Sequence, residues 1–149
     1  MAPMDADANT ILREQGAVLA DAIIDAIPGW VARCVARHAT GLDTDAASAA
    51  AAADVGPRLR ALLAADVDEQ RLNPLALVRD AVRYPTEVLA DAGVPPPSRS
   101  RFDVEHFPDD PYGLVPMTWR DVDDSLHELG VTWGAVKAMA HRQRHTGTS

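Results

Sequence analysis

Residues 9–27 read NTILREQGAVLADAIIDAI, and their apolar side chains recur at the three- and four-residue spacing of an α-helix. Side chains at this spacing lie on one face, and such a face is stable only when another element covers it. Ile11, Val18 and Ile24 widen the face on its flank. The stretch therefore predicts a helix at the centre of a helical bundle, with this row facing the core: Leu12, Leu19, Ile23 and Ile27.

Turn and capping residues divide the rest of residues 1–92 into further helices. Asn9 or Thr10 is expected to cap the first helix, and Pro28 either kinks it or begins a second one. Gly41 suits the position just after a helix end. Residues 42–66 predict another helix, which Gly56-Pro57 is expected to break or bend. Its cap is one of three residues, Asp43, Thr44 or Asp45.

Shorter helices are expected near the middle and at the end of the chain. Residues 73–82 have Asn73 as N-cap followed by proline at the first helical position, and residues 84–93 end at a glycine. Residues 132–145 predict the last helix, with Thr132 as cap and basic residues in its later part that suit the helix dipole.

Composition changes sharply after residue 92. Alanine, the best helix former, is absent from Gly93 to Gly134, whereas prolines are frequent in the first part of this stretch. We therefore expect a proline-rich, irregular arm over residues 93–117, wrapped across the helical body of residues 1–92. Closing helices follow at 118–145, and a disordered tail at 146–149. The fold prediction is an all-α, single-domain bundle of five to seven helices.

The totals exclude some classes of function. The chain has 149 residues, a formal net charge of −8 and one cysteine, Cys34. An acidic chain is repelled by phosphate backbones, so a nucleic-acid partner is not expected despite basic residues near the C-terminus. A single cysteine forms no internal disulfide, and no apolar run reaches the length of a membrane helix. We expect a cytoplasmic protein without a membrane partner.

Several segments resemble a known family. These are ADVDEQR (65–71), NPLALVRDAVRYPTEVLADAGVPP (73–96), FPDDPYGLVP (107–116) and LHELGVTWGAVKA (126–138). They are similar to a family of small, alanine-rich actinobacterial proteins. The resemblance covers about the last two thirds of the chain and implies a bacterial cytosolic protein. It carries over no catalytic or binding residues.

The stretch HFPDDPYG, residues 106–113, raises the question of catalysis because it places two adjacent carboxylates between prolines. Paired carboxylates divide acid and base roles when their environments separate their pKa values. Adjacent turn residues usually point apart, and Asp109 is expected to bond its own downstream backbone as an Asx-turn. The aromatic residues are better explained as anchors that lie in grooves of this chain or of another. The predicted interaction surface comprises Phe102, Phe107, Asp109, Asp110, Tyr112 and Trp119.

The leading functional hypothesis is a non-catalytic interaction or regulatory module that binds a protein partner or a second copy, with no cofactor. No phosphate-binding glycine loop, nucleophile elbow or paired-cysteine motif is present. The alternative is a small metal-dependent enzyme or metal sensor. Cys34 and His38 lie four residues apart, as do His141 and His145, and this spacing brings two ligands together on one face of a helix. The metal alternative uses six residues, namely Cys34, His38, His106, His127, His141 and His145, with Asp109 and Asp110 as further oxygen donors.

Overall fold

The structure, a computed structural model, describes residues 8–69 and 73–146. Every regular element within those ranges is helical, which confirms the predicted all-α bundle. None of the described helices is both long enough and apolar enough to cross a membrane. In chain order the elements are α1 (Ala8–Ala36), α2 (Asp45–Ala64), the 3₁₀ turn η1 (Val67–Glu69), α3 (Pro74–Asp80), α4 (Arg83–Asp91), α5 (Arg101–His106), α6 (Trp119–Val122) and α7 (Leu126–Thr146).

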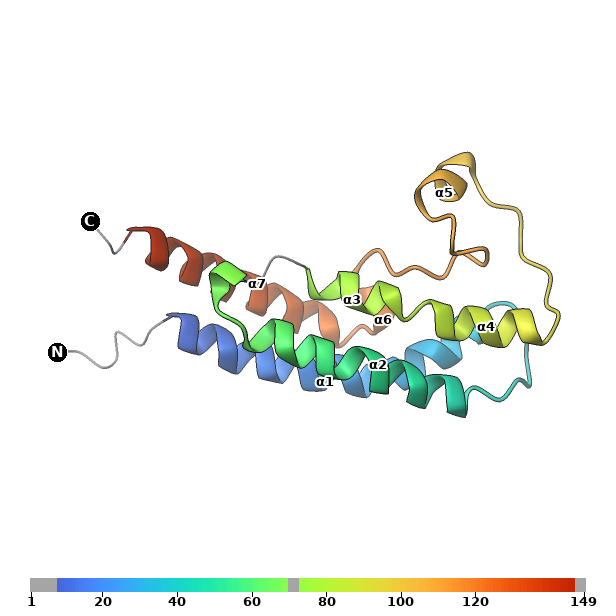
Figure 1. Ribbon diagram of the computed structural model, residues 1–149, viewed down its shortest axis with the longest axis horizontal. Helices are drawn as coiled ribbons and strands as arrows, with labels where there is room; N and C mark the ends of the chain where they lie inside the picture. Colours follow the sequence, from blue (N-terminus) through green and yellow to red (C-terminus); the bar gives the residue numbers. More distant parts are fainter. Residues whose placement is uncertain (1–7, 70–72, 147–149) are drawn as a thin grey trace.

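Helix α1 is the centre of the bundle, and α2 and α7 pack along it (Figure 1). The backbone N–H of Ala8 donates to Gln143 Oε1 at 2.8 Å, so the start of α1 lies beside the end of α7 and these two helices are antiparallel. Helices α3 and α4 follow one another and contact α2, and α4 also contacts α1. The long helix α1 therefore contacts α2, α4 and α7.

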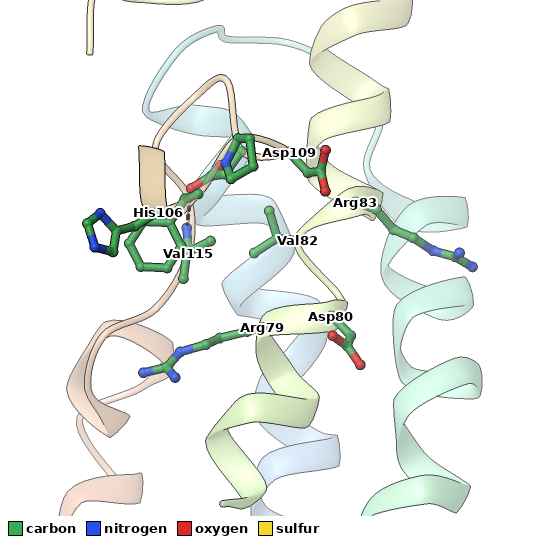
Figure 2. A pocket seen from close by; sticks show the side chains of 10 residues that line it. Arg79, Asp80, Val82, Arg83, His106, Asp109 and Val115 are labelled. Carbon is green, nitrogen blue, oxygen red and sulfur yellow. Dashed lines mark hydrogen bonds between the residues drawn. The ribbon is translucent and has the colours of Figure 1, made fainter. Parts of the chain in front are cut away.

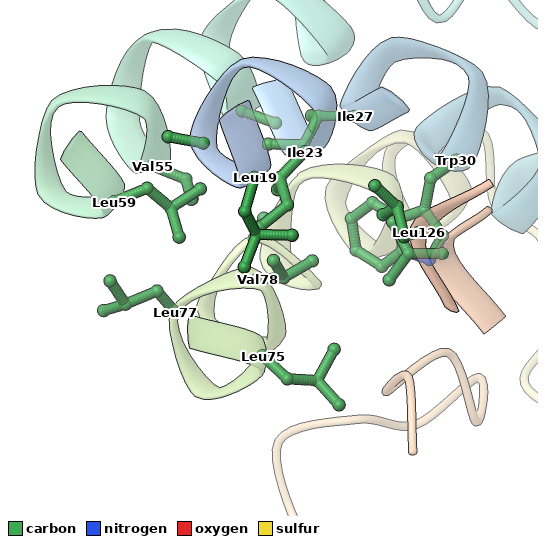
Figure 3. Close-up of a cluster of buried hydrophobic side chains, with 14 of the residues drawn as sticks. Leu19, Ile23, Ile27, Trp30, Val55, Leu59, Leu75, Leu77, Val78 and Leu126 are labelled. Atoms are coloured by element: carbon green, nitrogen blue, oxygen red, sulfur yellow. The ribbon is translucent and has the colours of Figure 1, made fainter. Parts of the chain in front are cut away.

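The predicted apolar row of α1 forms the core (Figure 3). Its four members are at most 1% exposed, and Trp30 extends the row toward the C-terminal end of α1. Apolar side chains from α2, α3 and α7 cover this row. Burial of such side chains stabilises the fold by about 1.5–3 kcal/mol each before entropy is subtracted. The covering residues drawn in Figure 3 include Val55, Leu59, Leu75, Leu77, Val78 and Leu126.

Helices α1 and α2 approach each other most closely at Gly16. A Cβ atom placed at this residue would lie 2.7 Å from the backbone oxygen of Leu63 and 3.1 Å from its Cβ. The alanine run of α2 contributes little bulk, and Ala51 is fully buried. Small residues on both helices therefore let the two backbones pack together.

Two prolines lie inside helices without ending them. Helix α1 continues through Pro28 and α2 continues through Pro57, so of the predicted break or bend at Gly56-Pro57 the break does not occur. Both proline side chains are exposed. Water can therefore reach the carbonyl groups that each proline leaves without a helical donor. Gly56 faces Ile24 of α1, which explains a small residue at this point.

Helix ends confirm some predicted caps and correct others. The Asn73 side chain accepts from the Leu75 N–H at 2.9 Å, as an N-cap does. Gly93 adopts φ 75°, and the Val94 N–H donates to the Leu89 carbonyl as in a Schellman motif. Gly41 also has a positive φ, but α1 ends five residues earlier. At the start of α2, it is the Asp43 side chain that accepts, from the Asp45 N–H at 2.9 Å.

Asn9 is not the cap of α1. It lies inside the helix and is buried, and its Oδ1 accepts from the Val67 N–H at 3.1 Å. Its Nδ2 donates to Asp66 Oδ2 at 3.4 Å. The side chain therefore ties α1 to the turn η1 across the bundle, a role that local sequence does not indicate.

The closing helix begins earlier than predicted. Helix α7 starts at Leu126, so Thr132 lies inside it and does not cap it. Gly130 is buried within the helix, and the indole of Trp119 rests on it. Thr146 is the last residue of α7, so the predicted tail does not start there, and residues 147–149 lie outside the described residues.

Candidate functional site

The arm between α4 and α6 contains one helix and a closed loop, so it is not irregular throughout. Residues 101–106 form α5, and the Ser100 side chain accepts from the Asp103 N–H at 3.1 Å as its N-cap. Helix α5 has no buried residue, and Figure 1 shows it standing clear of the body instead of wrapping across it.

Asp110 organises the loop that follows α5. Its side chain is only 4% exposed, and its two carboxylate oxygens accept from the N–H groups of Leu114 at 2.8 Å and Val115 at 2.9 Å. Arg99 closes the loop from the other side, because its Nη1 donates to the carbonyls of Phe107 and Asp110, each at 2.8 Å. A carboxylate buried with its own donors in this way holds backbone in place.

Tyr112 attaches this loop to the body. Its side chain is buried, and its hydroxyl donates to the Val94 carbonyl at 2.6 Å. Its ring lies 5.6 Å from the ring of His38, just after the end of α1. Gly113, the next residue, has φ 70° and lets the chain turn back. Tyr112 therefore joins the two ends of the arm to each other and to α1.

Trp119 packs within the chain as well. A Cβ atom at Gly130 would lie 2.5 Å from two atoms of the Trp119 indole, so the ring rests directly on the backbone of α7. Arg33 of α1 donates to the Val122 carbonyl and lies 3.8 Å from the Asp123 carboxylate. These contacts fix α6 between α1 and α7.

The outer part of the arm remains exposed. Phe102 is 57% exposed and stacks on His106, with ring centroids 4.0 Å apart, and Val104 is 47% exposed. Asp109 is exposed as well. The Nδ1 atom of His106 lies 2.9 Å from the Phe102 carbonyl. Helix α5 thus presents a phenylalanine and a valine to solvent on a loop that is held at its base.

A groove of about 340 Å³ separates this loop from α3 and α4 (Figure 2). Its polar lining includes Arg79, Asp80 and Arg83 from the helices and Asp109 from the loop. Figure 2 shows that Arg79 and Arg83 extend away from each other. The charged lining is mixed in sign, with Phe107, Pro108, Val82 and Val115 supplying apolar surface.

Three charged side chains of the groove have partners within the chain. Arg79 donates through Nε to the Pro116 carbonyl at 2.9 Å, and Asp80 pairs with Arg58 of α2 at 2.5 Å. Arg83 donates to the Tyr84 hydroxyl at 2.7 Å, and this bond raises the pKa of the guanidinium above its ordinary value. These contacts hold three charged side chains of the groove in place.

The predicted interaction surface does not lie on one face. Phe107, Asp109 and Asp110 line the groove, whereas Phe102 lies on α5. Asp110 and Tyr112 are interior residues, which corrects the prediction that they form part of an exposed surface. Trp119 is half-buried against α7. The physical reason is that Asp110 caps the backbone of its own loop, and that the rings of Tyr112 and Trp119 cover surfaces of this chain.

The residues of the metal hypothesis are not brought together. Cys34 is buried near the end of α1, and burial raises the pKa of its thiol to about 12, which opposes the thiolate form that binds zinc. His141 lies 3.8 Å from Asp68, beside the start of α1. Cys34 is near the other end of α1, about 39 Å away along the helix at a rise of about 1.5 Å per residue.

The other members of the metal hypothesis are also dispersed. His38 lies against Tyr112, His106 stacks on Phe102, and His127 lines a shallow hollow with Glu128. The side chain of His145 lies outside what the structure describes. Within the described residues no three histidine, cysteine, aspartate or glutamate side chains are placed to hold a metal ion.

Sequence reasoning missed the arginines that build the site. Arg79 holds the Pro116 carbonyl, and Arg99 holds two carbonyls of the loop. Each arginine binds backbone oxygens at a distance in the chain, so spacing gave no signal for either contact. The only indirect signal was a proline-rich segment with many carbonyls that lack neighbouring donors.

No protein-family model, curated protein or solved structure matches this chain.

Proposed function

We propose that the chain is a non-catalytic, cytoplasmic interaction module that binds a partner protein through α5 and the adjoining groove. The observation that supports this proposal is the state of α5. None of its residues is buried, and its two apolar side chains, Phe102 and Val104, are exposed to solvent. The helix stands at the tip of a loop whose base is held by hydrogen bonds.

The loop that carries α5 is held by more hydrogen bonds than are needed only to connect α4 to α6. A six-residue helix has little stability of its own. Here the chain caps it with Ser100 and closes the loop below it with the buried Asp110 carboxylate and with Arg99. Fixing the loop reduces the ordering entropy that a partner would have to overcome on binding. Such preorganisation favours a recognition element.

The chemistry of the surface indicates the kind of partner. Phe102 is an apolar anchor of the type that fills a pocket at the centre of an interface. The groove beside it offers Arg79, Arg83 and Asp109, so the rim carries both signs of charge. We propose a partner with an apolar pocket and a polar rim, bound through Phe102.

Site-specific cross-linking tests this proposal. A photoreactive phenylalanine analogue replaces Phe102 in the chain expressed in a bacterial host of the proposed actinobacterial type, and the adducts are identified by mass spectrometry. We expect one reproducible protein adduct. Adding His106→Ala to the labelled chain should reduce its yield, because the His106 ring lies one turn away on the same face of α5 and stacks on position 102.

The matched control carries the analogue at Val18, an exposed residue of α1 that is 49% accessible. Both positions are on the surface, so neither substitution is expected to alter the helical circular dichroism spectrum. The same adducts from both positions, or none from position 102, would contradict the proposal.

A further inference from the structure

Helix α7 has an outer face that is exposed among the described residues. The helix contacts α1, α6 and η1 through its inner side, where Trp133 and Ala140 are buried. On the outer side, Val131 is 59% exposed and Met139 is 50% exposed. An amphipathic helix ordinarily turns such residues toward a core, so this face is unusual for a monomer.

The residues of this face repeat at alternating intervals of three and four. Glu128, Val131, Ala135, Ala138 and Arg142 are all exposed and follow the spacing of a helix–helix seam. Met139 borders the seam beside Ala138. The row extends over about 21 Å, since each residue adds about 1.5 Å along a helix.

The row is also symmetric about Ala135 in its chemistry. Glu128 lies seven residues before Ala135 and Arg142 lies seven residues after it, and Val131 and Met139 each lie four residues away. An identical helix laid antiparallel across this face would therefore set Glu128 opposite the second copy's arginine. It would also set Val131 opposite the methionine, and the two alanines opposite each other.

The helix dipole accounts for only part of this pattern. An acid early in a helix and a base late in it are favourable within one chain. That effect gives no reason for large exposed apolar residues between the two charges. A self-complementary seam accounts for the apolar residues, because it buries Val131 and Met139, and it sets Glu128 near Arg142 of the second copy.

We propose that α7 pairs with α7 of a second copy of this chain, antiparallel, about a two-fold axis at Ala135. The small side chain on the axis lets the two helices approach closely. The surface is separate from α5, so this proposal goes beyond the interaction proposed for the arm. A seam of one helix per chain is at the small end of protein interfaces, so the dimer is expected to be weak and concentration-dependent.

Charge exchange tests the antiparallel register. Sedimentation equilibrium over a concentration series should show the mass of the wild type rising from 15.9 kDa toward twice that value. Glu128→Arg or Arg142→Glu alone sets like charges opposite each other at both ends of the two-fold seam, and should weaken association by about tenfold or more. The double variant restores opposite charges and should return the association to within a few-fold of the wild type.

Disulfide trapping tests the position of the axis. Ala135→Cys places a thiol opposite its own copy and should give a covalent dimer on mild oxidation. Thr132→Cys is an exposed control that this register sets opposite Ala138 of the second copy and not opposite its own counterpart, so it should give far less. The native Cys34 does not compete, because its side chain is 1% exposed and its pKa is about 12.

Three results would overturn the proposal. They are a monomeric mass at every concentration, a double charge variant that associates no better than the single ones, and equal trapping at both cysteine positions. All substituted residues are exposed, so circular dichroism should show unchanged helicity and exclude unfolding as the cause. Phe102→Ser on α5 should leave the mass unchanged, which separates this result from any failure of the arm proposal.

Discussion

Helix α1 and the arm are both folded, but different interactions hold them. Helix α1 is held by apolar burial, with Leu12, Ile23 and Ile27 fully inaccessible to solvent. The arm also buries Tyr112 and Leu114 against the body, but its loop is held above all by directed hydrogen bonds of Asp110 and Arg99. A buried apolar side chain contacts many neighbouring residues, so its loss affects all of them. A hydrogen bond joins one donor to one acceptor, so its loss affects mainly those two groups. Damage to α1 should therefore affect the whole protein, and damage to the arm should stay local.

The largest expected effect is that of Trp30→Ala in the core. The side chain is 1% exposed and lies at the end of the apolar row of α1. Its removal leaves a cavity and should lower the free energy of unfolding by about 3–5 kcal/mol. Urea denaturation followed by circular dichroism measures the change. Val18→Ala on the exposed side of α1 is the control and should change stability by less than about 0.5 kcal/mol.

A small loss for Trp30→Ala would break the comparison, because it would mean that burial along α1 does not carry the stability of the bundle. Equal losses for Trp30→Ala and Val18→Ala would have the same meaning. Either result would place the main stabilising contacts outside the core described here.

Gly16→Val tests the close contact of α1 and α2 and should have the next largest effect. The added side chain meets the Leu63 backbone, which cannot move without moving α2. We expect a loss of about 1–3 kcal/mol from overpacking. Gly134→Ala is the matched control, because a Cβ there has no neighbour within 4 Å and alanine is the better helix former. This variant should be as stable as the wild type or up to about 1 kcal/mol more stable.

Asp110→Ala tests the other side of the comparison. It leaves the N–H groups of Leu114 and Val115 without their acceptor, a local cost of about 1–3 kcal/mol. Hydrogen exchange should therefore accelerate at these two amides, while protection in the middle of α1 changes much less. Asp109→Ala, an exposed neighbour, should leave both amides protected. Equal acceleration in α1 and in the loop would show that arm and body unfold as one unit.

The two regions also differ in how far the sequence predicted them. The apolar row of α1 follows a local period, so it predicted the helix, its buried face and the all-α fold. Asn73 was equally predictable, because a cap acts on residues two or three positions away. In both cases the interaction that forms the structure is visible within a few residues.

Predictions failed where distant residues supply the contact. Thr132 was predicted to cap the last helix, but α7 begins at Leu126 and continues through Gly130, on which the Trp119 ring rests. Asp109 was expected to bind its own downstream backbone, but it is Asp110 that does so, and the burial of Asp110 depends on the fold around the loop. The candidate site was predicted only in part, since Arg79 and Arg99 bind carbonyls that no spacing rule connects to them.

Asp123 lies between the two regions and should show the smallest effect. It is the residue after α6, and hydrogen bonds from the side chain and backbone of Ser125 lower the pKa of its carboxyl. A carboxyl with a lowered folded-state pKa stabilises the fold above its unfolded pKa. That contribution is lost as the pH falls through the folded value.

Wild type and Asp123→Asn should therefore differ slightly in free energy of unfolding at neutral pH and converge as the pH falls below about 4. Urea titrations at several pH values measure this convergence, with the exposed Asp124→Asn as control. Because the carboxylate is 37% exposed, solvent keeps the difference small. A difference that grows on acidification would contradict the assigned sign. If hydrogen exchange in the Asp123→Asn variant is faster only in the first turn of α7, this junction is held by directed hydrogen bonds, as the loop of the arm is. The reason is that loss of a directed hydrogen bond affects only the residues next to it.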